Sequence, residues 1–293
     1  MRQICLLFLI ITGCSASLGG ERTVQDDLGR TVEVPLRIER IVPLAPNITE
    51  LLFASGAGSK VVGVSDYDDF PPAVDSLPQY SVIPTDFEAI VALDVDLVFA
   101  SEQVNNPKDA NTFAAAGVPV YFIAVNTLKD VTRAMRDLGE LLGTLEVAHK
   151  RATELEDSLA QLAMLTVNLP EKPDVLFLVE PATLYAFGQG SYIHDVIDLA
   201  GGHSITRTQS VRFPVLTDEF VLTSSPDVIV VSFGPEFNKS QLLTHHPTWD
   251  ILPAIVSDQV FRLDPAILRP GPRLVAGSWE LARVLHPEAV TNP

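Results

Sequence analysis

The chain has 293 residues, of which 47% are hydrophobic and 19% are charged. This composition indicates a globular protein, large enough for one large domain or two modest lobes, and excludes a disordered chain. The 20 basic and 37 acidic residues give a formal net charge of −17, and the basic residues form no long run. Nucleic acid and anionic membrane surfaces are therefore not expected as partners.

The N-terminus has the pattern of an export signal. Arg2 precedes an apolar run, Ile4 to Ile11, that is too short to span a bilayer as a helix. The run ends in Ile-Thr-Gly-Cys, which is similar to the cleavage box of bacterial lipoproteins. We expect residues 1–13 to be a signal peptide and Cys14 to be the lipidated first residue of a protein anchored at the periplasm or cell surface. An ordinary cleaved signal with an incidental cysteine is the alternative.

Residues 14–37 are expected to contain the lipidated N-terminus, a linker and a β-hairpin whose turn is at Gly29. From Arg40 onward, short β-branched runs alternate with helical patterns. Near-continuous apolar strands separated by helices are typical of parallel sheets that are covered on both faces. The predicted fold class is therefore α/β. We expect strands at residues 41–44, 61–65, 97–100, 120–125, 175–179, 228–233 and 260–263.

The centre of the chain has a different pattern. From Leu128 to about Val167, apolar residues recur at helical spacing without a proline, and charged residues fill the other face. One helix over residues 128–168 would reach about 60 Å, with Gly139 and Gly143 as places where it could kink. It would separate an N-terminal lobe (38–127) from a C-terminal lobe (169–293).

One short pattern occurs in both lobes. Glu88 and Glu219 are each followed eight residues later by an aspartate, Asp96 or Asp227, that begins an apolar run. Each glutamate is expected in the first turn of a helix that leads into a parallel strand. The helix macrodipole favours an acid there, but it does not require the same register in both lobes.

Several ordered segments resemble the substrate-binding proteins of vitamin B12 and iron-complex ABC importers. The resemblance covers the chain from about Arg37 to Pro287. It implies a class III periplasmic-binding-protein fold, in which two lobes with mainly parallel sheets flanked by helices are joined by one long rigid backbone helix. The segments are RIERIVPLAPNITELLFASGAGSKVVGVSDYDDFPP (37–72), LPQYSVIPTDFEAIVALDVDLVFA (77–100), GVPVYFI (117–123), DVIDLAGG (195–202), SSPDVIVV (224–231) and RPGPR (269–273).

The resemblance also implies a function. It indicates a solute receptor that captures a corrinoid of the vitamin B12 type between its lobes and delivers it to an ABC permease dimer with its ATPase. Haem and ferric siderophores remain alternative ligands. The expected ligand thus carries cobalt or iron, while the protein itself is expected to be a monomer without an intrinsic cofactor.

The resemblance places five ligand-binding side chains at the interlobe cleft. Flat aromatic faces suit macrocycles, and an arginine could pair with propionate or amide groups. Ordinary packing at the cleft edge is the alternative for any one of Tyr67, Tyr185 and Phe213. The five residues are Tyr67, Tyr185, Phe187, Phe213 and Arg269.

The tryptophans depart from the family pattern. Ile83 and Ser101 stand where some B12-binding relatives have tryptophan. Trp249 is expected to pack a loop, and Trp279 to be buried or half-buried on a helix. Because these tryptophans are missing, haem and ferric siderophores remain alternatives to a corrinoid as the ligand.

Three acidic residues receive separate interpretations. In the family that the chain resembles, one acid on each lobe docks with arginines of the permease, and Glu88 and Glu219 match these positions. Glu50 instead fits a capping box, with Asn47 as the helix cap, and is interpreted as structural.

Two other classes of function are not favoured. A bare Zn or Mn ion would need three or four convergent ligands, and the six histidines form no histidine-rich acidic loop. The sequence has no nucleophile elbow, zinc-protease helix motif or phosphate-cradling loop. Neither a metal site made by the chain alone nor an enzyme is therefore expected.

Overall fold

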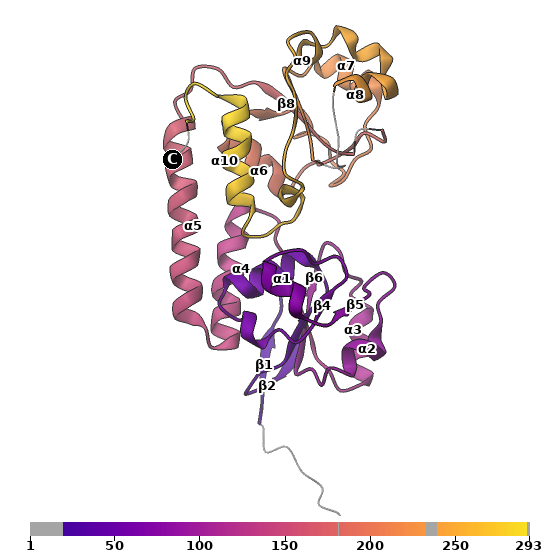
Figure 1. Cartoon of the computed structure of the whole chain (residues 1–293), viewed down its shortest axis with the longest axis vertical. Helices are drawn as coiled ribbons and strands as arrows, with labels where there is room; N and C mark the ends of the chain where they lie inside the picture. The colour runs from indigo at the N-terminus through magenta and orange to yellow at the C-terminus, as the bar shows by residue number, and fades with distance from the viewer. Residues whose placement is uncertain (1–19, 181, 233–238, 292–293) are drawn as a thin grey trace, which may run out of the picture.

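The computed structural model describes residues 20–180, 182–232 and 239–291. The protein is α/β, with two lobes that each contain a parallel sheet and with long helices along one side of both (Figure 1). The predicted signal peptide and Cys14 lie outside the described residues. Within those residues, no helix combines the length and apolar character needed to cross a membrane.

The N-terminal lobe contains a three-stranded parallel sheet with the order β3-β6-β7. Its strands are buried almost throughout, as expected for a sheet covered on both faces. A short parallel pair, β4 and β5, lies beside it. The elements are β3 (Ile41–Pro43), α1 (Pro46–Ala54), η1 (Gly58–Lys60), β4 (Val64–Ser65), η2 (Pro72–Ser76), β5 (Gln79–Tyr80), α2 (Phe87–Val91), β6 (Leu97–Ser101), α3 (Asp109–Ala115) and β7 (Val120–Ile123).

The C-terminal lobe contains the order β10-β8-β11-β12, all parallel, and β9 pairs antiparallel with β8. The predicted α/β class with mainly parallel sheets is thus confirmed. The elements are β8 (Asp174–Glu180), β9 (Tyr185–Ala186), α6 (Tyr192–Leu199), β10 (His203–Ser204), α7 (Asp218–Ser224), β11 (Val228–Val231), α8 (Lys239–His245), η3 (Pro247–Ile251), α9 (Pro253–Val256), β12 (Val260–Arg262), η4 (Pro265–Leu268) and α10 (Leu274–Leu285).

The expected hairpin is present. Strand β1 (Glu21–Gln25) pairs antiparallel with β2 (Thr31–Pro35). The turn between them contains Gly29 at φ +72°, a backbone conformation that glycine adopts without steric cost.

The same turn covers the outer edge of the N-terminal sheet. Asp26 Oδ2 accepts a hydrogen bond from Phe122 N at 3.3 Å, and Asp27 Oδ2 accepts one from Ala124 N at 2.8 Å. The Asp27 N–H also donates to the Phe122 carbonyl at 3.1 Å. Two carboxylates and one backbone amide therefore satisfy groups of the edge strand β7 that would otherwise be open to another chain.

The expectation of one continuous helix over residues 128–168 is wrong. Helix α4 (Leu128–Leu142) ends at Gly143, which has φ +75°, and helix α5 (Leu145–Thr166) runs back beside α4. Glycine in the left-handed region is a common helix terminator. The 22 residues of α5 span about 33 Å, and in Figure 1 α5 runs alongside both lobes. The helical spacing of apolar residues continued through the turn, so periodicity did not reveal it.

The two helices of this hairpin pack closely. A side chain at Gly139 would overlap the Ala148 Cβ, so the crossing depends on a residue without a Cβ. Arg136 donates two hydrogen bonds to the Glu156 carboxylate, at 2.6 and 2.7 Å. This bidentate pairing lowers the pKa of Glu156 to about 2.

The repeated Glu-x7-Asp pattern corresponds to the same local structure in both lobes. Glu88 and Glu219 lie in the first turns of α2 and α7, as predicted. After each helix, one residue has the left-handed backbone conformation. It is Asp94 in the N-terminal lobe and Ser225 in the C-terminal lobe, in each case two positions before the aspartate of the repeat. Both helices then lead into a parallel strand.

Each aspartate of the repeat accepts hydrogen bonds from backbone N–H groups at the start of the neighbouring strand. Asp96 Oδ2 accepts hydrogen bonds from Glu39 N at 2.7 Å and Arg40 N at 2.8 Å, just before β3. Asp227 Oδ2 accepts one from Asp174 N at 2.9 Å, at the start of β8. The shared register therefore has a structural basis, because the aspartate must reach the start of the adjacent strand.

We predict that Asp96→Ala destabilises the protein more than Asp227→Ala does. At about 1 kcal/mol for each hydrogen bond lost, the expected losses in the free energy of unfolding are about 2 and about 1 kcal/mol. Urea unfolding followed by circular dichroism measures both. Equal losses, or a larger loss for Asp227→Ala, would contradict the assignment.

Candidate ligand site between the lobes

The loops after the parallel strands of the two lobes face each other. Asp69 follows β4 and contacts Arg269, which follows β12 of the other lobe. Glu102 follows β6 and contacts Arg212 of the C-terminal lobe. In open α/β sheets, ligands bind outside the carboxyl ends of the strands. These facing loops are therefore the candidate ligand site.

At one side of this site, Glu50 forms ion pairs between the lobes, and its side chain is 1% exposed. Arg273 donates to the Glu50 carboxylate with Nη2 at 2.6 Å and Nε at 3.0 Å, and Arg269 Nη1 lies 3.5 Å from it. Burial raises the pKa of the Glu50 carboxyl, while the two guanidinium groups oppose that rise. The pairing joins the first helix of the N-terminal lobe to the C-terminal lobe.

The predicted capping box at Glu50 is wrong. Helix α1 begins at Pro46, its cap residue is Ala45, and no side chain caps it. The Asn47 side chain instead donates to the Pro270 carbonyl at 3.4 Å, across to the other lobe. The Asn-x-x-Glu spacing thus places both polar side chains on the face of α1 that meets the C-terminal lobe.

Two of the predicted ligand-binding residues, Tyr67 and Arg269, are neighbours. Arg269 pairs with Asp69, and its Nη2 lies 3.4 Å from the Tyr67 carbonyl oxygen. The hydrogen bonds from Arg269 lower the pKa of the Asp69 carboxyl. Tyr67 is 53% exposed as a residue, so it is accessible to a ligand.

The other predicted aromatic residues form a cluster in the C-terminal lobe. The Tyr185 and Phe213 rings stack with centroids 6.2 Å apart and an interplanar angle of 11°. Phe187 meets Phe213 edge-on at 5.8 Å, but Phe187 is only 5% exposed. It can therefore contribute to a ligand site by supporting Phe213 rather than by offering its own ring face.

Arg212 completes this half of the site and was not predicted. Its guanidinium carbon lies 5.6 Å from the centroid of the Phe213 ring. Its Nη1 is 3.4 Å from Glu102 Oε1, and its Nη2 donates to Asn126 Oδ1. The only sequence signal was its position beside Phe213, because the groups that it contacts come from the other lobe.

The aromatic cluster depends on Gly188. The segment 184–189 runs antiparallel to residues 209–216, with hydrogen bonds that include Gly188 N to the Arg212 carbonyl at 2.8 Å. A Cβ at Gly188 would overlap the carbonyl oxygen of Val211. The two segments can approach this closely only because residue 188 is glycine.

The predicted docking residues lie away from this site. Glu88 and Glu219 are exposed, and neither carboxylate has an ion pair among the residues that the structure describes. Helices α2 and α7, which carry them, lie at opposite ends of the molecule in Figure 1.

His246 and the two tryptophans lie in packed surroundings. Trp249 is fully buried, and its ring stacks on His246 with centroids 4.4 Å apart. Trp279 is buried on α10 and donates from Nε1 to Ser158 at 3.0 Å. The expectation for Trp279 is confirmed, whereas Trp249 lies on η3 in the core of the C-terminal lobe rather than packing a loop. Across the described ranges, no group of three or more His, Cys, Asp or Glu side chains is arranged to hold a metal ion.

We predict that Gly188→Ala separates the segments 184–189 and 209–216 and lowers stability, because a backbone oxygen has to move. Gly271→Ala is the matched control, since its nearest heavy atom would be 3.6 Å away, an ordinary contact. Thermal unfolding and near-ultraviolet circular dichroism of the aromatic cluster measure the effect. Equal melting temperatures for the two variants would refute the close approach.

Comparison with known proteins places the chain among solute receptors. It matches the periplasmic binding protein family over residues 41–267. A Bacillus subtilis protein named as an uncharacterized ABC transporter substrate-binding lipoprotein, YvrC, is 27% identical and covers 91% of this chain and 86% of its own. The vitamin B12-binding protein of Vibrio cholerae is 29% identical, with coverages of 82% and 86%.

A solved structure has the same architecture. The periplasmic haem-binding protein RhuT of Roseiflexus is 27% identical, has a TM-score of 0.72, and covers 86% of this chain and 99% of its own. The predicted class III binding-protein fold is thus confirmed. The chain belongs to the periplasmic binding protein family, whose members are solute-binding transport proteins rather than a class of enzymes.

Proposed function

We propose that this protein captures a corrinoid of the vitamin B12 type between its lobes and delivers it to an ABC permease. The observation that carries this proposal is the placement of partly exposed aromatic residues beside guanidinium groups where the strand ends of the two lobes meet. Tyr67 and Arg269 supply one side, and the Tyr185–Phe213 stack with Arg212 supplies the other. Such surfaces suit a flat macrocycle with amide or carboxylate substituents.

The relatives support the corrinoid first. A vitamin B12-binding protein is similar over 82% of this chain. Haem is the second candidate, because its two propionates could pair with Arg212 and Arg269 and because a haem-binding protein shares the fold at 27% identity. A ferric siderophore remains a third possibility of the same transporter class.

The location and partners of the protein follow from the same proposal. A receptor for an importer works outside the cytoplasm, and the similar Bacillus subtilis protein is named a lipoprotein. We therefore keep Cys14 as the lipid anchor and a permease dimer with its ATPase as the partner of a monomeric receptor. Glu88 and Glu219, exposed on helices at opposite ends of the molecule, are the proposed contacts with permease arginines. Exposed ion pairs of this kind contribute orientation and encounter rate more than affinity.

We predict that calorimetry of the mature chain detects one molecule of cobalamin or cobinamide per protein, with haem and ferric siderophores as competing ligands. Tyr67→Ala and Tyr185→Ala should each weaken binding roughly tenfold by removing a stacking face. Ile251→Ala, an exposed apolar residue on η3, is the control and should leave affinity unchanged. Tighter binding of haem than of either corrinoid would replace the first candidate by the second, and no binding of any of these ligands would refute the proposal.

A second prediction concerns docking. Glu88→Ala combined with Glu219→Ala should leave ligand affinity intact and strongly reduce uptake by cells that contain the protein and its permease. Glu146→Ala with Glu154→Ala changes the charge equally on α5 and should leave uptake normal. A large loss of ligand affinity in the first variant would show that these acids belong to the ligand site instead.

A further inference from the structure

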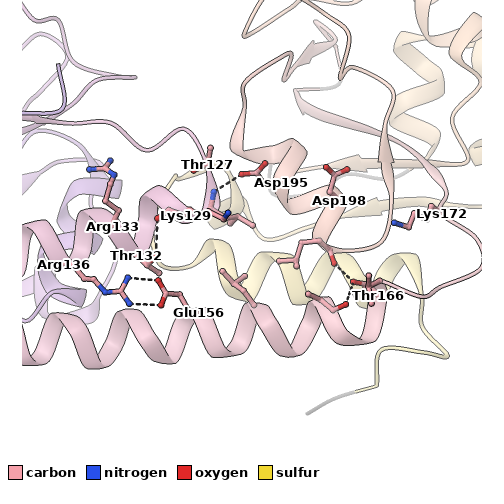
Figure 2. Close-up of a pocket in the computed structure, with 15 residues that line it drawn as sticks. Thr127, Lys129, Thr132, Arg133, Arg136, Glu156, Thr166, Lys172, Asp195 and Asp198 are labelled. Atoms are coloured by element: carbon pink, nitrogen blue, oxygen red, sulfur yellow. Dashed lines mark hydrogen bonds and ion pairs between the residues drawn. The ribbon is translucent and has the colours of Figure 1, made fainter. Parts of the chain in front are cut away.

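A groove lies on the helical side of the molecule, away from the interlobe site. This groove has a volume of about 880 Å³ and is bounded by α4, α5 and α6. In Figure 2, α5 runs along the bottom of the view, and residues of α4 and α6 line the groove above it. The volume lies within the range of about 300 to 1,000 Å³ that is typical of small-molecule sites.

The floor of the groove is apolar. It is formed by Leu128 of α4, Leu159 and Ala163 of α5, and Leu199 of α6, and it continues to Val167 just beyond the end of α5. Val167 is 62% exposed. Apolar surface of this kind gains free energy when a ligand removes it from water.

Some of the charged side chains around this floor have partners within the described part of the protein, and others do not. Arg136 is paired with Glu156, and Asp198 is paired with Arg207. Asp195 accepts a hydrogen bond from Leu128 N at 3.1 Å.

Arg133, the other arginine that lines the groove, forms ion pairs with Asp27, Asp130 and Asp137. Lys129 and Lys172 are exposed and have no hydrogen bond or ion pair from their side chains within the described ranges. On a protein with a net charge of −17, two unengaged cations at one apolar groove indicate an anionic group on its occupant.

We propose that this groove binds a small amphipathic anion, namely a single-chain fatty carboxylate, with its chain on the apolar floor and its carboxylate near Lys129 or Lys172. One lysine borders the groove from the start of α4 and the other from the segment just before β8. An occupant would therefore contact the helical hairpin and the C-terminal lobe together. The proposal does not rest on which ligand binds between the lobes.

The test is calorimetric titration of the mature chain with dodecanoate below its micelle concentration. We expect saturable binding of one molecule per protein and weaker binding of the neutral dodecanol. Lys129→Gln with Lys172→Gln should weaken dodecanoate binding up to about fivefold, because the carboxylate loses its one exposed ion pair. Lys108→Gln with Lys150→Gln removes the same charge from exposed positions outside the groove and should change little.

A second variant tests the apolar floor. Val167→Asp places a carboxylate at an exposed position of the groove, where the fold can accept it, and should abolish dodecanoate binding while leaving the melting temperature nearly unchanged. Absence of saturable binding overturns the proposal. So does an equal loss in the two lysine pairs, or unaltered binding by Val167→Asp.

Discussion

One hydrophobic cluster passes from the N-terminal sheet through the helical hairpin into the C-terminal lobe, and the relative placement of the lobes depends on it. It includes Phe99 of β6, Met135 of α4, Leu162 of α5, Phe177 of β8 and Leu281 of α10. Interiors packed at crystal-like density do not slide without repacking, so a large rotation of one lobe would break contacts throughout this cluster. Small adjustments of the facing loops are the movements that such a body permits.

The hydrophobic cluster sets the placement of the lobes, and the polar contacts between the lobes add to their orientation. Taking the Glu50 carboxylate and its arginine partners out of water costs about as much as their attraction returns, so they orient the lobes more than they stabilise them. Arg212 lies beside the Phe213 ring, and Arg269 lies beside the Tyr67 carbonyl oxygen. Both are engaged by side chains of the opposite lobe, which fixes their position before a ligand arrives.

The parts of the structure that could be predicted from sequence have local signals. Alternation, glycine turns and acidic first turns predicted the strands, the hairpin at Gly29 and the places of Glu88 and Glu219. Glu50 was misinterpreted because its partner Arg273 lies 223 residues away in the chain, and a capping motif offered a nearer explanation. Arg212 was missed for the same reason. The reversal at Gly143 was hidden because both helices of the hairpin bury faces with one continuous spacing.

The carboxylates that close the edge of β7 have a consequence for the order of folding. The hairpin that carries Asp26 and Asp27 is synthesised first and can form locally within microseconds. The strand that it covers comes 96 and 97 residues later in the chain. Until β7 has joined its sheet, these side chains have nothing to cover, and the unfinished sheet keeps an open edge. Completion of the N-terminal lobe therefore waits for a long loop to close, and a partly emerged chain is most exposed to wrong pairing during that interval.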